Sequence, residues 1–396
     1  MFTNLKPLPA DPILGLSTLF KADTNPQKVD LGVGVYKNDA GQTVIMEAVQ
    51  KAYQHLCDTE GSKVYVSPAG WAGFTNSIAK LALGSEIAKT YSDQLGAVQT
   101  PGGCGALRLG FELISGISPE AKVWVSNPTW ANHIPIITAS GLGYETYDYY
   151  NKATSSIDLE AMIASLRAVK AGDIVLLHGC CHNPTGADIP AQDQSTLIAF
   201  LKEQGLVPFV DMAYQGFAEG LDTDAGLTRQ IFEEIPEAFL TYSCSKNFGL
   251  YRERTGAIIV KGPRSDSAPA LTTHLCKIAR QSYSMPPAHG AALVTTVMES
   301  DVLCEEWRNE LEAMRSRVVG LRTSFATALS ENGIGDDVTR VGDQAGMFSI
   351  LNLSEAQVLQ LRNDYSIYMP SDGRINVAGL TFTNIPYVVN SILSII

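Results

Sequence analysis

Short apolar runs alternate along the chain with longer segments in which apolar residues recur at helical spacing. Helices are predicted at Ala106–Ile114, after a glycine turn, and at Ala191–Glu203, where Leu197, Phe200 and Leu201 share one face. Runs rich in Val, Ile, Leu and Phe on both faces predict buried parallel strands at Lys122–Ser126, Asp173–His178, Leu206–Asp211, Phe239–Ser243 and Gly256–Val260. The alternation indicates an α/β fold.

The last third of the chain has a different pattern. One long, highly charged helix is predicted over Val302–Ala328, and such a helix can connect two domains. Short strand-like pieces follow at Gly346–Leu351 and Arg374–Ala378, and a last helix is predicted at Asn384–Ile395. We therefore expect an N-terminal arm, a small domain made from both ends of the chain, and a large middle domain, with the respective bounds 1–12, 13–44 with 313–396, and 45–312.

Composition narrows the classes of protein that the chain can represent. It has 396 residues, 45% of them hydrophobic, which suits one large domain plus a smaller one. Its 29 basic and 41 acidic residues give a net charge of −12, which disfavours nucleic acid and anionic membranes as partners. The apolar stretches are too short to span a bilayer, and the first residues do not resemble a signal peptide. Seven irregularly spaced cysteines suggest free thiols, so a cytoplasmic location is expected.

A glycine-rich stretch, Thr100–Leu107, leads into the first predicted helix, which begins straight after its glycines. Its glycines allow a sharp turn, and free N–H groups at a helix start attract phosphate. The stretch lacks the Gly-Lys-Ser/Thr ending of a nucleotide-binding loop. Arg108 stands where the dinucleotide-binding motif would have its third glycine. A plain turn before a helix is the simpler alternative.

The stretch His178–Gly186 follows a predicted strand and contains two histidines and two cysteines. A metal site is disfavoured there because the adjacent side chains of Cys180 and Cys181 point in different directions. Asn-Pro-x-Gly is a turn sequence that would hold Asn183 rigidly at the strand end. From that place its amide can donate to a ligand oxygen.

Asp211 ends another apolar strand. A carboxylate is costly to bury there unless a cation meets it, and a protonated pyridine nitrogen would do so. Tyr214, three residues later, could reach the same ring. The alternative for Asp211 is the ordinary role of a helix cap.

Lys246 follows a fourth strand, where a lysine is usually solvated. Here it follows Ser243 and Ser245 and precedes Arg254, and hydroxyls and a guanidinium are good partners for phosphate. An amine beside them can form an imine with an aldehyde. Together with Asp211 and the glycine loop, these residues suit one cofactor, pyridoxal phosphate.

With these residues, the chain resembles the class I aminotransferases, and within them the bacterial aspartate and aromatic amino acid aminotransferases. The likeness runs from Asp11–Leu16 to Arg374–Gly379 and is most specific at His178–Gly186, Ala213–Phe217 and Ser245–Arg254. It implies the fold type I of pyridoxal-phosphate-dependent transferases, with a large domain built on a mixed, mostly parallel sheet and a smaller α/β domain. It also implies a homodimer with shared active sites, and transamination of an L-amino acid with 2-oxoglutarate.

The resemblance assigns roles residue by residue. Lys246 would be the Schiff-base lysine and proton carrier, and Asp211 would pair with the pyridinium nitrogen. Contacts to the cofactor are expected from Gly102, Gly103, Cys104, Trp130, Asn183, Tyr214, Ser243, Ser245 and Arg254, and from Tyr65 of the neighbouring subunit. The substrate would meet Gly34, Trp130, Asn183 and Arg374, with Arg280 of the neighbour at the distal carboxylate. Trp130 and Tyr214 are counted with Lys246 and Asp211 as catalytic.

Two features depart from the family pattern. Cys104 stands where the family usually has Thr or Ser, and because a thiol is the poorer donor, we expect slightly weaker cofactor retention.

The substrate preference is mixed. Val35, Lys37 and Thr43 resemble the aspartate-preferring type. At two other positions that type tends to have Asn, where this chain has Val64 and Met285. Apolar residues there would ease burial of an aromatic ring, so use of both aspartate and Phe, Tyr or Trp is expected.

Other functions fit the sequence less well. A strict aspartate aminotransferase is the nearest alternative. A lyase or decarboxylase with the same cofactor would share Lys246 and Asp211, but the likeness extends to both substrate arginines. A regulatory protein would be expected to carry a basic DNA-binding segment, which is not evident. A nicotinamide-dependent dehydrogenase would need the missing glycine motif.

Overall fold

The computed structural model describes residues 2–7, 12–335 and 340–396, without the side chains of residues 12–14. Residues 1 and 8–11 of the expected N-terminal arm lie outside the described residues. The helices are α1 (Pro12–Ala22), α2 (Glu47–Thr59), α3 (Phe74–Leu83), α4 (Ser85–Thr90), α5 (Gly102–Ile117), α6 (His133–Ala139), α7 (Leu159–Leu166), α8 (Ala191–Gln204), α9 (Leu221–Asp224), α10 (Gly226–Glu234), α11 (Ser267–Ser282), α12 (Ala288–Glu299), α13 (Asp301–Glu331), α15 (Glu355–Tyr365) and α16 (Ile385–Leu393), with 3-10 turns η1 (Arg340–Asp343) and η2 (Val377–Gly379). The strands are β1 (Val29–Asp30), β2 (Leu95–Pro101), β3 (Lys122–Asn127), β4 (Gly143–Asp148), β5 (Tyr150–Asn151), β6 (Ser156–Ile157), β7 (Ile174–His178), β8 (Val207–Met212), β9 (Ala238–Ser243), β10 (Thr255–Lys261), β11 (Phe348–Ile350), β12 (Ile367–Tyr368) and β13 (Arg374–Asn376).

The central sheet has seven strands in the order β2-β10-β9-β8-β7-β3-β4. All five predicted strands are present in it. Strands β9, β8, β7, β3 and β4 run parallel, but β10 pairs antiparallel with both β9 and β2. The prediction that Gly256–Val260 is a parallel strand is therefore wrong. Its apolar pattern reports burial on both faces, and burial does not depend on strand direction.

Two strands of this sheet, β2 and β4, were not predicted. β4 is an edge strand whose residues are mostly exposed, so it lacks the apolar run that marks an interior strand. β2 contains a glycine and polar residues among its few apolar positions. The helix predicted at Ala106–Ile114 corresponds to α5, which begins earlier, at Gly102. The glycines that were expected to form a turn before this helix are therefore part of it. The long helix and the terminal helix are confirmed as α13 and α16.

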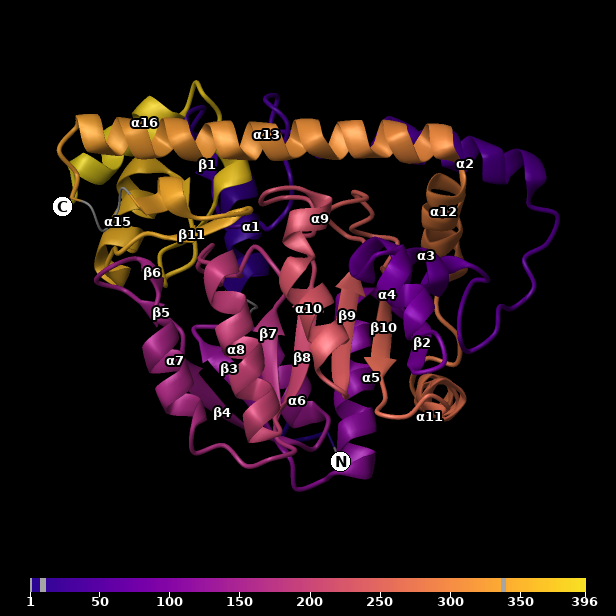
Figure 1. Ribbon diagram of the computed structural model, residues 1–396. Coiled ribbons are helices and arrows are strands. Elements are labelled where there is room, and N and C mark those ends of the chain that lie inside the picture. Colours follow the sequence, from indigo (N-terminus) through magenta and orange to yellow (C-terminus); the bar gives the residue numbers. More distant parts are fainter. Residues whose placement is uncertain (1, 8–11, 336–339) are drawn as a thin grey trace.

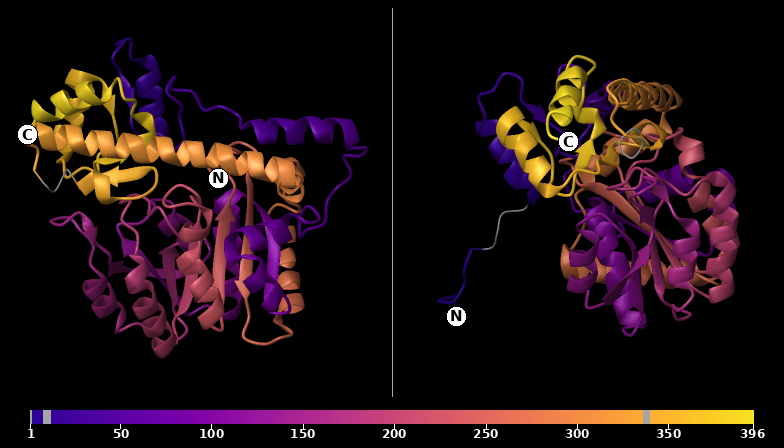
Figure 2. Two further views of the ribbon diagram at one scale, coloured as in Figure 1. Left: turned by 45° about the horizontal axis from the view of Figure 1, so that its top comes forward. Right: turned by 90° about the vertical axis from the view of Figure 1, so that its left-hand side faces the viewer.

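The sheet is covered on both faces by helices (Figures 1 and 2). Alternate residues of one strand enter two separate apolar cores. Leu176 of β7 packs in the core that contains Phe111 of α5, whereas Leu177 packs in the core that contains Leu201 of α8. This arrangement explains why the predicted strands are apolar at every position.

Helix α13 crosses the molecule from the end of α12 to the C-terminal elements (Figure 1). Near its start Trp307 stacks on Phe248, with ring centroids 4.5 Å apart, and its indole N–H donates to the Asn247 carbonyl over 2.7 Å. Further along, Arg322 is 2% exposed and donates to the carbonyls of Val341, Ala345, Gly346 and Phe348. The helix thus contacts both the sheet region and the C-terminal region.

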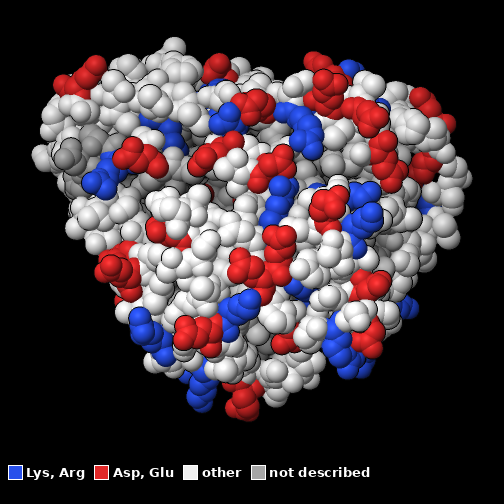
Figure 3. Space-filling view, viewed as in Figure 1, with Lys and Arg blue, Asp and Glu red and all other residues white. Residues whose placement is uncertain are grey.

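The two ends of the chain meet in the C-terminal region. β1 pairs in parallel with β12, and the Asn376 backbone N–H donates to the Leu31 carbonyl over 2.7 Å. The exact bounds of a small and a large domain stay a prediction. On the face shown in Figure 3, acidic and basic side chains are interspersed over the described surface. No helix among the described residues is long and apolar enough to cross a membrane.

Candidate active site

A cavity of about 230 Å³ lies where the carboxyl ends of β7, β8 and β9 meet the start of α5 and the C-terminal region. Ligands bind at this edge of the sheet in open α/β folds. The cavity brings together most of the site residues predicted from the sequence, namely Gly34, Gly103, Cys104, Trp130, Asn183, Asp211, Tyr214, Ser243, Ser245, Lys246, Arg254 and Arg374. Leu107, His178, Ala213 and Phe348 also line it and were not predicted.

One end of the cavity is suited to a phosphate. Gly102, at the start of α5, has a φ of +70°, and a Cβ atom there would lie 2.6 Å from the Arg254 guanidinium. The left-handed backbone favours glycine here, and the lack of a side chain lets Arg254 keep this position. Arg254 itself has a φ of +53° and donates to the Tyr251 carbonyl over 3.0 Å, while the Ser243 hydroxyl donates to Ser245 over 3.1 Å. Helix-start N–H groups, two hydroxyls and a guanidinium form an anion site.

Asp211, at the end of β8, is 9% exposed and held by two side chains. Thr241 donates to one carboxylate oxygen over 2.9 Å, and His133 Nε2 lies 3.1 Å from the other. Burial, the largest single influence, would raise the pKa of Asp211. The hydrogen bonds from His133 and Thr241 and the electrostatic effects of His133 and His178 together outweigh it, so the pKa is below its usual range. For neutral His133 to donate at Nε2, its Nδ1 must accept from the Thr129 hydroxyl, 2.8 Å away.

His133 was missed from the sequence. It lies one helical turn after Thr129, just past β3, but a single histidine at a helix start carries no recognisable signal. Its ring meets Trp130 and His178 edge-on, each with centroids 5.2 Å apart. Burial and the neighbouring His133 lower the pKa of His178 to about 3, so His178 is neutral.

Lys246 lies beside Tyr214, with its amine 4.7 Å from the centre of the phenol ring. Burial lowers the pKa of Lys246 to about 8, although the nearby Asp211 carboxylate raises it. About a tenth of this amine is therefore neutral at pH 7, far more than for an ordinary lysine, and the neutral form acts as a nucleophile or base.

At the opposite end of the cavity Arg374 is 6% exposed, and its Nε has no hydrogen-bond partner. Its other nitrogens donate to Asn183 Oδ1 over 3.4 Å and to the Gly32 carbonyl over 2.7 Å. Burial lowers its pKa. Within the described chain no carboxylate lies within ion-pair distance of this guanidinium. A buried cation without an anion is costly, so the site favours an anionic ligand here.

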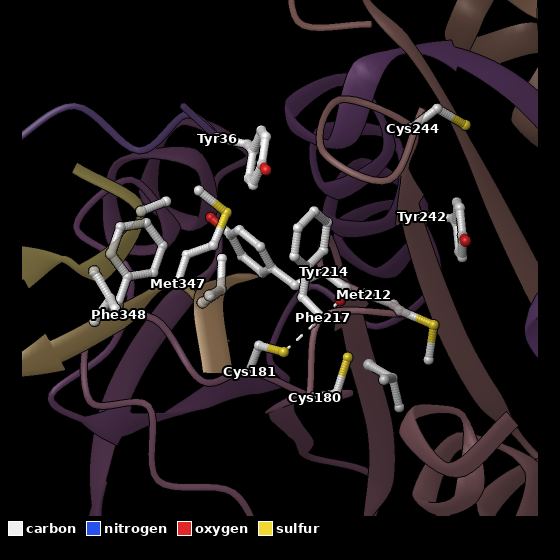
Figure 4. Packing of buried hydrophobic residues seen from close by; sticks show 14 of the residues in the cluster. Tyr36, Cys180, Cys181, Met212, Tyr214, Phe217, Tyr242, Cys244, Met347 and Phe348 are labelled. Atoms are coloured by element: carbon white, nitrogen blue, oxygen red, sulfur yellow. Dashed lines mark hydrogen bonds between the residues drawn. The ribbon is translucent and has the colours of Figure 1, made fainter. Parts of the chain in front are cut away.

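Phe348 supports this guanidinium. The charge of Arg374 lies 4.7 Å from the centre of the Phe348 ring, and Tyr214 meets the same ring edge-on at 5.7 Å. A Cβ atom on Gly34 would lie 3.0 Å from Phe348 Cζ, so Phe348 would have to shift by a few tenths of an ångström to admit a side chain there. Figure 4 shows Phe348 and Tyr214 side by side. A lone phenylalanine in a short strand gives no sequence signal, so Phe348 was missed.

The structure does not bring Tyr65 and Arg280 to this cavity. Tyr65 is 86% exposed, in the segment between α2 and α3. Arg280 is exposed near the end of α11 and donates to Ser284 of its own chain. Cys104 lines the cavity, and its thiol accepts from the Asn132 amide over 3.7 Å.

Cys180, Cys181 and Asp224 place possible metal-ligand atoms close together. Asp224, however, already accepts from the backbone N–H groups of Gly216, Ala218 and Glu219. The Cys181 thiol donates to the Tyr214 carbonyl over 3.7 Å (Figure 4). Although Cys181 lowers it, burial raises the pKa of Cys180 to about 11. Because metals bind thiolates, this group is better explained as packing.

The cavity fits pyridoxal phosphate at three points: the anion site at Gly102 and Arg254, the buried carboxylate of Asp211, and the amine of Lys246. When bound, this cofactor supplies an aldehyde that reacts with amines and a ring that withdraws electrons from the reacting carbon. The charged Asp211 can hold a proton on a ring nitrogen. Lys246 Nζ, with its lowered pKa, can take and return a proton, and Arg374 can orient a carboxylate.

Comparison with known proteins agrees with this geometry. The family model described as Aminotransferase class I and II matches residues 26–392. A tyrosine aminotransferase of Rhizobium meliloti is 44% identical over 96% of both chains, and an aspartate aminotransferase of Salmonella typhi is 40% identical over the whole of both. The solved structure of an aromatic-amino-acid aminotransferase from Burkholderia pseudomallei, covalently bound to pyridoxal phosphate, superimposes with a TM-score of 0.96 at 37% identity, covering 100% of this chain and 99% of that one.

The chain belongs to the class I and II aminotransferase family. It is a transferase of fold type I that uses pyridoxal phosphate to move amino groups.

Proposed function

We propose that this enzyme transfers the amino group of aromatic L-amino acids and of aspartate to 2-oxoglutarate, giving the corresponding keto acid and glutamate. The observation that carries the proposal is the shared cavity of Lys246, Asp211 and Arg374. It combines an amine of lowered pKa, a charged buried carboxylate and an unpaired buried guanidinium. The relatives named for tyrosine and for aspartate support the two substrate classes.

The residues take the following roles in the proposal. Lys246 would be the base that takes a proton from the substrate's α-carbon and returns it as the amino group is transferred. Asp211 would keep the cofactor's ring nitrogen protonated, with His133 holding the carboxylate in place. Arg374 and Asn183 bind the α-carboxylate beside Gly34. Trp130 would stack on the face of the cofactor ring, and Asn183 and Tyr214 would contact its phenolate oxygen. The phosphate would be held by Gly102, Gly103, Cys104, Ser243, Ser245 and Arg254. A planar guanidinium suits a carboxylate because it can donate two parallel hydrogen bonds.

A homodimer completes this site. Apolar side chains that are exposed in the single chain gather in the segment from Val44 to Tyr65, with Val44 at 49%, Ile45 at 62%, Tyr53 at 52% and Val64 at 79% exposure. Val44, Ile45 and Tyr53 line a wide surface groove beside the Gly249–Glu253 turn, which precedes Arg254. In a dimer, Tyr65 and Arg280 would reach the site of the partner subunit. The expected location is the cytoplasm.

Dual substrate use follows from the residues near Arg280. Val64 and Met285 leave less polar surface unpaired than asparagines would when an aromatic ring is buried. Arg280 would bind the distal carboxylate of aspartate, glutamate or 2-oxoglutarate. It would move aside for Phe, Tyr or Trp, with Ser284 as a partner that it already contacts.

A substrate panel with the purified holoenzyme and 2-oxoglutarate tests the proposal. We expect keto acid and glutamate in equal amounts from both aspartate and phenylalanine. A preference for aspartate above about a thousandfold in kcat/KM, roughly 4 kcal/mol, would leave a strict aspartate aminotransferase. Formation of alanine or ammonia without glutamate would instead indicate a decarboxylase or lyase.

A further inference from the structure

The segment from Leu31 to Tyr36 passes the substrate end of the cavity and carries Gly34. On one side it is attached to the C-terminal region through its backbone carbonyls. Arg374 donates to the Gly32 carbonyl over 2.7 Å, and the Asn376 amide donates to the carbonyls of Val33 and Val35 over 2.6 and 2.8 Å. These bonds tie the segment to the same strand that holds Arg374.

On its other side the segment meets the turn that holds the phosphate end. The Tyr36 backbone N–H donates to the Tyr251 phenol oxygen over 2.8 Å. The Tyr251 carbonyl in turn accepts from Arg254 over 3.0 Å. A single residue, Tyr251, therefore touches both the phosphate arginine through its backbone and the substrate segment through its side chain.

The hydrogen bond between the Tyr36 N–H and the Tyr251 phenol oxygen should persist over a wide pH range. Burial raises its pKa, so the phenol stays neutral across the usual pH range of an enzyme. Tyr36 is also fixed, with 8% exposure, a hydrogen bond from Thr43 to its carbonyl over 2.8 Å and the Arg317 guanidinium 5.7 Å from its ring centre. In the view of Figure 4, Tyr36 lies above Tyr214 and Met347.

We propose that Tyr251 is a positioning residue: its phenol oxygen holds the Tyr36 N–H, and thereby the backbone at Gly34, at the substrate end of the cavity. The inference rests on the proposed role of Gly34 beside the substrate. In addition, the segment from Leu31 to Tyr36 is held by Tyr251 from the phosphate end as well as by Arg374 from the substrate end. Removing the phenol oxygen would loosen the substrate end and leave the phosphate end intact, because the Tyr251 carbonyl remains.

The test is Tyr251→Phe in the full-length holoenzyme, which removes one oxygen and keeps the ring. A neutral hydrogen bond contributes about a factor of three to ten to an equilibrium. We therefore expect KM for glutamate and for 2-oxoglutarate each to rise about three- to tenfold, with kcat within about twofold. The Kd for pyridoxal phosphate should not change. Hydrogen–deuterium exchange of the peptide containing Tyr36 should become faster.

Tyr147→Phe is the matched control. Its phenol also makes a 2.8 Å hydrogen bond to the backbone, at the Leu176 carbonyl, but at the edge of the sheet and outside the cavity. It should lower thermal stability without changing KM or exchange at Tyr36. Unchanged KM values in Tyr251→Phe would overturn the inference, as would a parallel loss of cofactor affinity. Absence of transamination in the unmodified enzyme would contradict the proposed function itself.

Discussion

The two ends of the cavity are built in different ways. At the cofactor end Asp211 lies at the end of β8, and Ser243 and Lys246 lie at and just past the end of the neighbouring β9. Residues near them along the chain complete the anion site. At the substrate end Gly34 and Arg374 come from opposite ends of the chain, and Tyr65 and Arg280 lie outside the cavity. The cofactor end is thus set by one rigid element, whereas the substrate end depends on the meeting of separate pieces. Changes at the two ends should therefore affect different measured quantities.

The largest effect is expected from Lys246→Ala. Because the proposed function makes one amine both nucleophile and proton carrier, we expect kcat/KM to fall by at least about 10⁴-fold. The phosphate end is untouched, so the variant should still bind pyridoxal phosphate non-covalently. Steady-state kinetics and equilibrium dialysis of the cofactor measure the two properties. Retention of more than about 1% of the activity would contradict the assigned role.

Arg374→Lys should affect the substrate end alone. A lysine keeps the charge but cannot donate two parallel hydrogen bonds, so we expect kcat/KM for glutamate to fall about a hundredfold or more. The Kd for pyridoxal phosphate should stay within about twofold. The comparison between the two ends would be wrong if cofactor affinity fell as steeply as substrate affinity.

The pH dependence of cofactor capture probes Lys246 directly. With a pKa of about 8, its amine is mostly protonated at pH 7 and mostly neutral at pH 9. Since only the neutral amine attacks an aldehyde, the rate at which apoenzyme is reconstituted should rise about tenfold over this range and then level off. Absorbance of the bound cofactor follows the reaction. A rate that keeps rising to pH 10 would show an amine with the ordinary lysine pKa.

Cys104→Thr should give the smallest effect. The hydroxyl can donate to the phosphate, which a thiol does poorly, so we expect the cofactor Kd to fall about two- to fivefold. KM for both substrates should not change, because Cys104 lies at the phosphate end. An unchanged or higher Kd would mean that the thiol does not weaken the anion site.

The cofactor end could be predicted from the sequence because its residues follow apolar strands directly. A strand followed by a polar residue and a glycine turn can be recognised from neighbouring residues alone. Because the carboxyl ends of parallel strands lie at the same edge of the sheet, these polar residues are expected to lie close together. The orientation of β10 could not be predicted, since a strand buried on both faces has the same composition in either direction. His133 and Phe348 were missed for a related reason. Their roles arise from contacts with Asp211 and Arg374, which are distant in sequence.

At the substrate end the sequence alone pointed to Asn183, through its turn sequence, but pointed to Gly34 and Arg374 only through the family resemblance. Nothing local marks Arg374 as an unpaired buried cation, because its burial depends on Phe348 and on the segment at Gly32. The exposure of Tyr65 and Arg280 in the single chain agrees with their expected action in a partner subunit, which stays a prediction.

Helix α13 contacts both the cofactor end and the substrate end of the cavity through residues at two places along its length. Trp307 donates to the carbonyl of Asn247, the residue after Lys246. Arg322 donates to the carbonyl of Phe348, whose ring packs against Arg374. The two anchors are roughly 22 Å apart along the axis at 1.5 Å per residue. One inserted residue between them would rotate Arg322 by about 100° and detach its hydrogen bonds. This stretch can therefore vary in composition during evolution but hardly in length, and natural insertions are expected elsewhere.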